Sequence, residues 1–279
     1  MNARAEVGIF TGHLDNVICA SFSADGKYLA TTSKDTTMIV WDVMTTKRML
    51  TLKHAKVVIC CRFSPDSKYL VSGCQDRICR LWDTSRGREW ISYSQHKGII
   101  ISLAFSPCGK YVCSSSSDKT LRVWSATSAK TRFTLLGHRG IILSCSYSSD
   151  GRYIISNDEA SLRVWLAKNG CSVLKLSPTD IAGNVTFIPN PLKRGNDNMN
   201  NSHASSKLTW TLSCGAPGGF TDYCIAACSN RFVYIIDIQT GNEVVSTYVR
   251  APVYCLTVGS NAYAACGDAF GNIYMLQIE

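Results

Sequence analysis

One sequence segment recurs four times and limits the folds that are open to this chain. The copies are SADGKYLATTSKDTTMIVWD (Ser23–Asp42), SPDSKYLVSGCQDRICRLWD (Ser64–Asp83), SPCGKYVCSSSSDKTLRVWS (Ser106–Ser125) and SSDGRYIISNDEASLRVWL (Ser148–Leu166). Their tryptophans stand 41, 42 and 41 residues apart, at Trp41, Trp82, Trp124 and Trp165. A fixed period of about 40–45 residues indicates repeated units that bury their faces only against neighbouring units.

Each copy reads as a series of short strands. In the first copy the apolar or alternating runs are Val17–Ser23, Tyr28–Ser33, Met38–Val43 and Lys47–Lys53, with turn-forming residues between them. Short strands at this spacing indicate an all-β fold. Asp25-Gly26 and Asp150-Gly151 suit hairpin turns that need positive φ. The sequence therefore predicts a ring of four-stranded blades, whose strands are named a to d in chain order.

A histidine precedes each copy, and an acid lies inside it at nearly constant spacing. The histidines are His13, His54, His96 and His138, and the acids that follow by 22, 22, 22 and 21 residues are Asp35, Asp76, Asp118 and Glu159. Each acid lies six residues before a tryptophan. This spacing spans several strands, so the three side chains hold the same places in every unit.

These residues resemble the WD40 (β-transducin) repeat. Gly12-His13 and Gly137-His138 match its Gly-His pair, and Trp41-Asp42 and Trp82-Asp83 match its Trp-Asp pair. The resemblance covers residues 12–166, weakens beyond them, and implies a WD40 β-propeller.

The resemblance also implies a buried hydrogen-bond chain within each blade. In the first blade, Trp41 would donate to Ser33, Ser33 to His13 and His13 to Asp35. Buried indole and imidazole groups need such partners. Ser116 takes the place of Ser33 in the third copy, whereas Cys74 and Asn157 predict weaker chains in the second and fourth blades.

Serine, histidine and aspartate in one network also resemble a hydrolase triad. A catalytic group should occur once, in one cleft, whereas this one recurs at blade spacing. We therefore interpret the repeated Ser–His–Asp network as structural and expect no catalytic residue. The sequence also contains no P-loop, HExxH, GxSxG or Rossmann motif, so we expect no enzyme activity.

The rest of the chain accommodates two further units. CIAACSNRFVYIIDIQTGNE has Asn230 and Ile236 in the places of the acid and the tryptophan, and Val253–Gly259, Tyr263–Gly267 and Ile273–Ile278 supply three strands of a last unit. Six blades of about 42 residues leave room for an insertion, whereas seven would need about 287 residues. We expect six blades in a single domain spanning residues 1–279, with seven as the alternative.

The insertion corresponds to the polar stretch NPLKRGNDNMNNSHASSK and is assigned to residues 179–206 of a degenerate fifth blade. If strand a of this blade is Ile181–Ile188, the insertion joins strands a and b at the bottom rim. If strand a is Lys207–Cys214, which we favour, the insertion joins two blades at the top rim. His203 is then either a loop residue, the simpler interpretation, or a displaced blade histidine.

The last unit lacks a strand d, and Ala5–Phe10 is a candidate for it at the other end of the chain. We expect the ring to close by pairing of this N-terminal strand with the C-terminal blade, because such closure leaves no free sheet edge.

Composition narrows the remaining possibilities. Fourteen cysteines lie mostly in strand-like runs without metal-ligand spacing, so we expect reduced thiols, no metal and no cofactor.

The N-terminal sequence MNARAEVGIFTGH lacks the apolar core of a signal peptide, and no apolar run reaches the ~20 residues of a membrane helix. We expect a cytoplasmic or nuclear protein without a transmembrane segment. The net charge of +9 indicates a solvated basic face or an anionic partner.

The resemblance implies where partners bind. In WD40 propellers the d–a and b–c loops reach the top rim, and the residues beside the repeated acid or after the histidine touch partners. The residues in these places are Lys34, Lys56, Gln75, Arg77, Lys97, Ser117, Lys119 and Arg139. We predict a basic top face that docks an acidic peptide or protein surface, against the alternative that these are ordinary solvated side chains.

Two function classes therefore remain. The first, which the resemblance favours, is a non-enzymatic interaction scaffold or adaptor, a monomeric ring within a larger complex. The second is a propeller that binds a polyanion, RNA or phosphoinositide, although no RNA-binding motif supports it.

Overall fold

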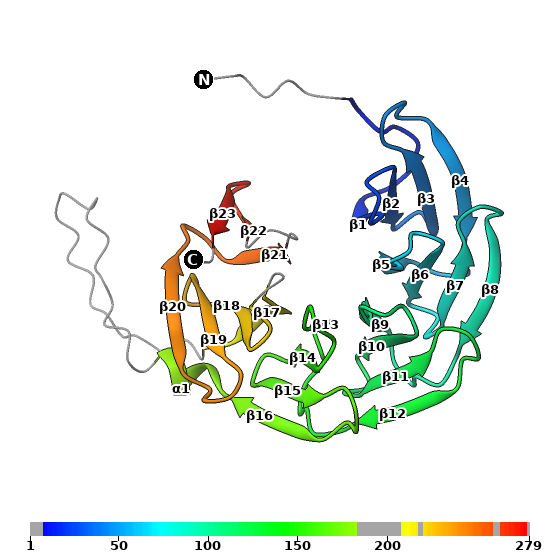
Figure 1. Ribbon diagram of the computed structural model, residues 1–279. Helices are drawn as coiled ribbons and strands as arrows, with labels where there is room; N and C mark the ends of the chain where they lie inside the picture. Colours follow the sequence, from blue (N-terminus) through cyan, green and yellow to red (C-terminus); the bar gives the residue numbers. More distant parts are fainter. Residues whose placement is uncertain (1–7, 183–207, 217–219, 259–262, 278–279) are drawn as a thin grey trace, which may run out of the picture.

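The computed structural model describes residues 8–182, 208–216, 220–258 and 263–277, and nearly all of its regular structure is strand (Figure 1). The first three blades comprise β1 (Val17–Phe22), β2 (Tyr28–Ser33), β3 (Thr37–Asp42) and β4 (Arg48–Lys53); β5 (Val58–Phe63), β6 (Tyr69–Cys74), β7 (Cys79–Asp83) and β8 (Arg88–Tyr93); and β9 (Ile100–Phe105), β10 (Tyr111–Ser116), β11 (Leu121–Ser125) and β12 (Thr131–Leu135). The next three comprise β13 (Ser144–Tyr147), β14 (Tyr153–Asn157), β15 (Leu162–Leu166) and β16 (Ser172–Leu176); β17 (Trp210–Gly215), β18 (Tyr223–Cys228), β19 (Phe232–Asp237) and β20 (Glu243–Tyr248); and β21 (Val253–Val258), β22 (Tyr263–Asp268) and β23 (Ile273–Gln277).

These strands form six antiparallel sheets, each built from consecutive strands. The innermost strands β1, β5, β9, β13, β17 and β21 pack side by side in that order, so the sheets are arranged as the blades of a propeller (Figure 1). The expected all-β propeller and its count of six blades are confirmed. Five sheets have four strands, and the sixth has three in the part of the chain that the structure describes.

A β-bulge between strands c and d marks the tryptophan place in five blades. The register shifts next to Trp41, Trp82, Trp124 and Trp165, and again at Ile236 of the fifth blade. A bulge adds one residue to one strand and locally increases its twist. Its recurrence at Ile236 confirms that the fifth blade keeps the backbone of the repeat after losing its tryptophan.

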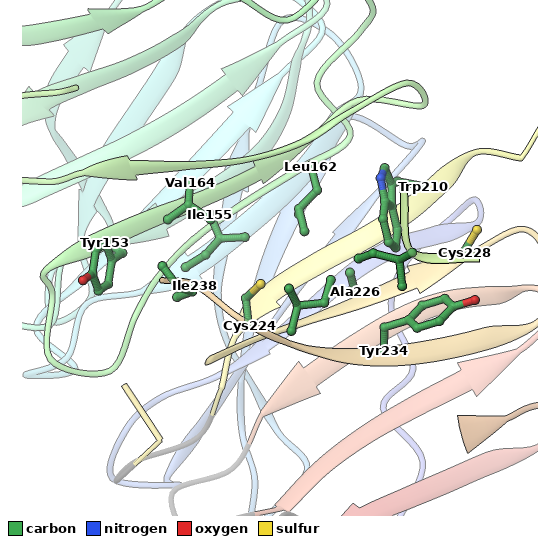
Figure 2. Packing of buried hydrophobic residues seen from close by; sticks show 12 residues of the cluster. Tyr153, Ile155, Leu162, Val164, Trp210, Cys224, Ala226, Cys228, Tyr234 and Ile238 are labelled. Carbon is green, nitrogen blue, oxygen red and sulfur yellow. The ribbon is translucent and has the colours of Figure 1, made fainter. Parts of the chain in front are cut away.

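The hydrophobic core lies between the blades. Strand c presents two side chains to the next blade, such as Leu162 and Val164 of the fourth blade, which share a buried cluster with Trp210 and Ala226 of the fifth (Figure 2). Equivalent clusters join each consecutive pair of blades from the first to the sixth. Each blade therefore depends on its neighbours for burial of its apolar faces.

The insertion enters the fifth blade before its first strand. β16 is followed by the short helix α1 (Pro178–Ala182), and β17, which begins at Trp210, is strand a. Strand a of this blade is therefore β17, which overlaps the alternative that we favoured, and Ile181 lies in α1. Residues 183–207, including His203 and most of the predicted insertion 179–206, lie outside the described residues.

The N-terminal segment reaches the first blade beside Trp41. Phe10 packs edge-on against the Trp41 ring, with 5.7 Å between ring centroids, in the place where Tyr93 of strand d stacks on Trp124 at 4.9 Å. Residues 5–7 of the expected closing strand lie outside the described residues, and residues 8–10 are not in a strand. Closure by the N-terminal strand therefore stays a prediction.

Among the described residues, no helix has the length and hydropathy of a membrane span.

We expect Leu162→Ala to lower the free energy of unfolding by about 2–5 kcal/mol, because it removes a fully buried side chain from the seam between the fourth and fifth blades. The control Val244→Ala, at an exposed position of β20, should change it by less than about 0.5 kcal/mol. Urea unfolding measures both, and equal effects would contradict the packing described here.

Candidate functional site

A buried hydrogen-bond chain runs from the tryptophan to the top rim of the first blade. The Trp41 indole donates to Thr31 Oγ1 at 2.8 Å, His13 Nε2 lies 2.8 Å from the same hydroxyl, and His13 Nδ1 lies 2.8 Å from Asp35 Oδ2. The order of the groups, from tryptophan through a hydroxyl and histidine to the acid, is as predicted. The prediction that Ser33 supplies the hydroxyl was wrong. Ser33 instead donates to the backbone carbonyl of Asp15 and accepts from the Asp35 amide.

The same correction holds in the other three repeats. The bridging hydroxyls are Ser72, Ser114 and Ser156, each within 2.8 Å of the histidine of its blade and accepting from its tryptophan. Ser116 therefore bridges no histidine and tryptophan. Residues two apart on a strand share a face, so alternation alone did not separate Thr31 from Ser33. The sequence did contain a signal that identifies the bridging residue, because that position is serine or threonine in all four repeats.

In the fourth blade the acid is Asp158, and the prediction of Glu159 was wrong. His138 Nδ1 lies 3.2 Å from Asp158 Oδ2, while Glu159 is exposed. Four residues lie between the paired Asn157 and Leu162 of this blade, against five between Thr32 and Met38 of the first blade, so its b–c turn does not keep the spacing of the other repeats. With Ser156 in place, this chain is complete, and Asn157 does not weaken it.

In the second blade the chain is interrupted at the acid. His54 Nδ1 faces the carbonyl of Leu52 at 3.2 Å, and Asp76 instead forms an ion pair with Arg80, with 2.7 Å between Oδ2 and Nη2. The expected weakness of this blade is therefore present, but its cause is Arg80 and not Cys74.

The acids also hold the backbone of the top rim. The amides of Leu14, Lys97 and Arg139, each directly after a blade histidine, donate to Asp35, Asp118 and Asp158 at 2.8–2.9 Å. Each acid also accepts bonds from its own b–c turn, as Asp118 does from the amide and hydroxyl of Thr120. One carboxylate thus joins the d–a loop to the b–c turn of its blade.

Burial and hydrogen bonding fix the charge states in this chain. Burial raises the pKa of Asp118, but bonds from Thr120, His96 and the Lys97 amide outweigh it and lower the pKa to about 2. Burial lowers the pKa of His138 to about 4, although Asp158 acts in the opposite direction. At neutral pH His138 is therefore neutral, so its Nδ1–H faces the Asp158 carboxylate and its Nε2 accepts from the Ser156 hydroxyl.

The predicted contact residues lie together on the rim that these carboxylates organise. Lys34, Arg77 and Lys119 are exposed on b–c turns, and Lys56, Lys97 and Arg139 are exposed on d–a loops, while Gln75 and Ser117 are half-buried. Amides of the b–c turns donate to carbonyls of the d–a loops, as Lys34 does to Asn16, Gln75 to Val57 and Ser117 to Ile99. The two sets of loops therefore form one continuous surface in each of the first three blades.

The cations of this rim are not neutralised by ion pairs within the described part of the chain. None of Lys34, Lys56, Arg77, Lys97, Lys119 and Arg139 is among the ion pairs of the structure. At the opposite rim, by contrast, Arg152 pairs with Asp150 and Asp222. The rim acids Asp35, Asp118 and Asp158 already accept several internal bonds, so the exposed charge is mainly positive.

Two of these cations are presented by an unusual backbone. Arg77 and Lys119 directly follow the acid of their blades and have φ of 72° and 67°. Thr36 and Arg231, at the same place in their own turns, both have φ of 69°. Non-glycine residues in this conformation cost about 1–2 kcal/mol each. The turn holds these side chains outward at the same place in successive blades.

These features define a class of protein: a propeller whose blades are braced by Trp–hydroxyl–His–Asp chains and whose loops carry the exposed polar surface. The WD40 family profile, described as "WD domain, G-beta repeat", matches residues 4–42, 46–83, 87–125 and 129–165. The chain belongs to the WD40 family, whose fold is typical of protein-interaction scaffolds.

A similar relative is a Notchless protein homolog of Arabidopsis thaliana, which is 50% identical over 42 residues. The match covers 15% of this chain and 9% of that protein, so it spans about one blade.

We expect Ser114→Ala to lower the free energy of unfolding by about 1–3 kcal/mol, because it leaves the Trp124 indole and His96 Nε2 buried without a partner. Urea unfolding measures this loss, and the Trp124 indole proton should shift in the NMR spectrum. Ser92→Ala, at an exposed place on β8, is the control. A loss no larger than in the control would contradict the bridging role of Ser114.

Stability should fall as the pH is lowered from about 6.5 to about 4. Over this range the unfolded chain protonates its histidines, whereas burial keeps His54 and His138 neutral in the folded state until about pH 4. The unfolded state therefore binds more protons, and each such histidine contributes up to about 1.4 kcal/mol per pH unit.

Urea midpoints at pH 7, 6 and 5 measure this slope, which should be smaller in His54→Gln. A midpoint that does not change between pH 7 and pH 5 would contradict the neutral state of these histidines.

Proposed function

We propose that this protein is a non-enzymatic scaffold that uses the top rim of its first four blades to dock an acidic peptide or an acidic protein surface. The observation that carries the proposal is the set of six exposed cations on that rim, which take part in none of the ion pairs among the described residues. Opposite charge across an interface accelerates association and excludes partners of like charge.

The rigidity of the rim supports the proposal. In the third and fourth blades the carboxylate that accepts from the histidine also accepts the amide of Lys97 or Arg139. The backbone of the contact residue is therefore held before any partner binds. A preorganised surface loses less conformational freedom on binding, which favours affinity.

The blade chains themselves support a structural role for the histidines and acids. They recur in several blades, and the side chains of His96 and His138 are fully buried. A buried, repeated network provides no single cleft in which a substrate meets a nucleophile.

A polyanion is the second candidate, because the same cations would attract RNA or phosphoinositide headgroups. Such binding depends steeply on salt and tolerates changes of sequence or headgroup. In the described loops that carry these cations, no aromatic side chain alternates with them, as stacking on single-stranded bases would require. The acidic protein partner is therefore the better-supported candidate.

We expect Lys34→Glu/Arg77→Glu/Lys119→Glu to reduce recovery of protein partners from the native cell by about tenfold or more, because it reverses three outward charges on one rim. The matched control is Lys27→Glu/Lys68→Glu/Lys110→Glu, which reverses three exposed charges on the a–b turns of the same blades at the opposite rim. Quantitative mass spectrometry of affinity-purified samples measures both.

Equal recovery by the two variants would contradict a partner site on the top rim. Binding of generic single-stranded RNA or phosphoinositide vesicles that only the first variant loses, with protein partners unchanged, would instead favour the polyanion.

A further inference from the structure

The sixth blade exposes an apolar face that each of the other five blades buries. Two places on strand c face the next blade, and in the first four blades their side chains are at most 2% exposed. These side chains are Met38 and Val40, Cys79 and Leu81, Leu121 and Val123, and Leu162 and Val164. In the fifth blade Val233 is 2% exposed and Ile235 is partly buried, whereas in the sixth Ile273 is 77% and Met275 63% exposed.

The first blade is uncovered on the side that faces this opening. Val17 of β1 is 55% exposed, whereas the residues at the same place of the other five blades are at most 1% exposed (Val58, Ile100, Ile142, Trp210 and Val253). The cluster around Trp41 contains Phe10, Leu29, Ile39 and Val43 but no residue of the sixth blade. Figure 1 shows the ring open between the sheet of β21–β23 and the sheet of β1–β4.

The edge strand at the opening also lacks the protection that exposed edges carry. β23 has the sequence IYMLQ, without a charged residue, and within the described residues it pairs only with β22. The outer strands of the other blades carry charges, such as Arg48 and Lys53 on β4 and Arg88 and Glu89 on β8. Charged residues are one way in which soluble proteins prevent pairing at a free edge. Their absence from β23 indicates an edge that pairs.

We propose that the opening between the sixth and first blades is a docking site for a second polypeptide, which supplies a β-sheet with the chemistry of a propeller blade. One strand of this sheet would pair with β23, in place of the N-terminal strand Ala5–Phe10 that the sequence predicts there, so the two assignments exclude each other. The two apolar faces of the sheet would cover Ile273 and Met275 on one side and Val17 on the other. The five seams between successive blades already define what covers such faces: a twisted antiparallel sheet with apolar residues on both sides. This site is independent of the basic top rim.

The occupant is tested by site-specific photocrosslinking in the native cell, with p-benzoylphenylalanine in place of Met275. The expected product joins this position to one strand-forming segment of a different polypeptide, with at least about a tenfold loss of yield in Ile273→Lys. The same amino acid in place of Val245, an exposed residue of β20, is the control and should give no such product. Ile273→Lys itself should leave the melting temperature unchanged, because the side chain it replaces is exposed.

Three outcomes would overturn the proposal. A crosslink from Met275 to residues 17–22 of the same chain would mean that the ring closes on itself, and a crosslink to residues 1–10 would mean that the N-terminal segment covers the face. A crosslink between isotopically labelled and unlabelled copies would mean that the occupant is a second copy of this chain.

The shape of the opening is tested separately, with the protein's own repeat as the probe. A copy of residues 126–166, which supplies strand d of one blade and strands a to c of the next, is joined after Glu279. If the opening accepts a blade, the melting temperature should rise by at least about 5 °C, and this rise should be lost in Ile273→Lys/Met275→Lys. No rise in the first protein would overturn the proposal even if a crosslinked partner were found.

Discussion

The structure depends on the burial of one face of strand c by the blade that follows it. A single four-stranded sheet has two apolar faces and cannot bury both alone, so each blade is stable only between neighbours. Leu162 and Val164 illustrate this, because they share one buried cluster with Trp210 and Ile236 of the next blade. The polar chains and the exposed rim are positioned by this repeated packing between blades.

The polar chains connect that packing to the surface. The Trp124 indole lies in the seam next to Tyr93, and Ser114, His96 and Asp118 lead from it to the amide of Lys97 at the rim. Because the histidine is neutral and the acid ionised, every donor in this chain has one acceptor and the arrangement has one direction. The same residues that satisfy buried groups therefore fix the loops that face a partner.

Much of this architecture could be predicted from the sequence, because the period of the tryptophans gave the blade and the alternation within each copy gave its strands. The strands of the first blade follow from local pattern, and the count of six follows from the repeat period and the number of residues. The errors arose where two readings share a pattern. Thr31 and Ser33 lie on the same face of β2, and the b–c turn of the fourth blade departs from the spacing of the other repeats, so that a constant distance to the tryptophan pointed to Glu159 instead of Asp158. The diversion of Asp76 to Arg80 depends on three-dimensional packing, which spacing does not encode.

The blades differ in a way that relates the polar chains to the opening of the ring. The first four keep a histidine, a bridging hydroxyl and a tryptophan, whereas the fifth has Ala226 and Ile236 in the last two places and the sixth has Leu276 in the place of the tryptophan. A blade without this chain lacks the buried bonds that join histidine, hydroxyl and tryptophan in the other blades, so its stability depends more strongly on having a neighbour on each side. The sixth blade has such a neighbour on only one side among the described residues, and its bare face carries Ile273 and Met275 in places that are buried in the first four blades. A second sheet against that face would restore the one interaction on which every other blade relies.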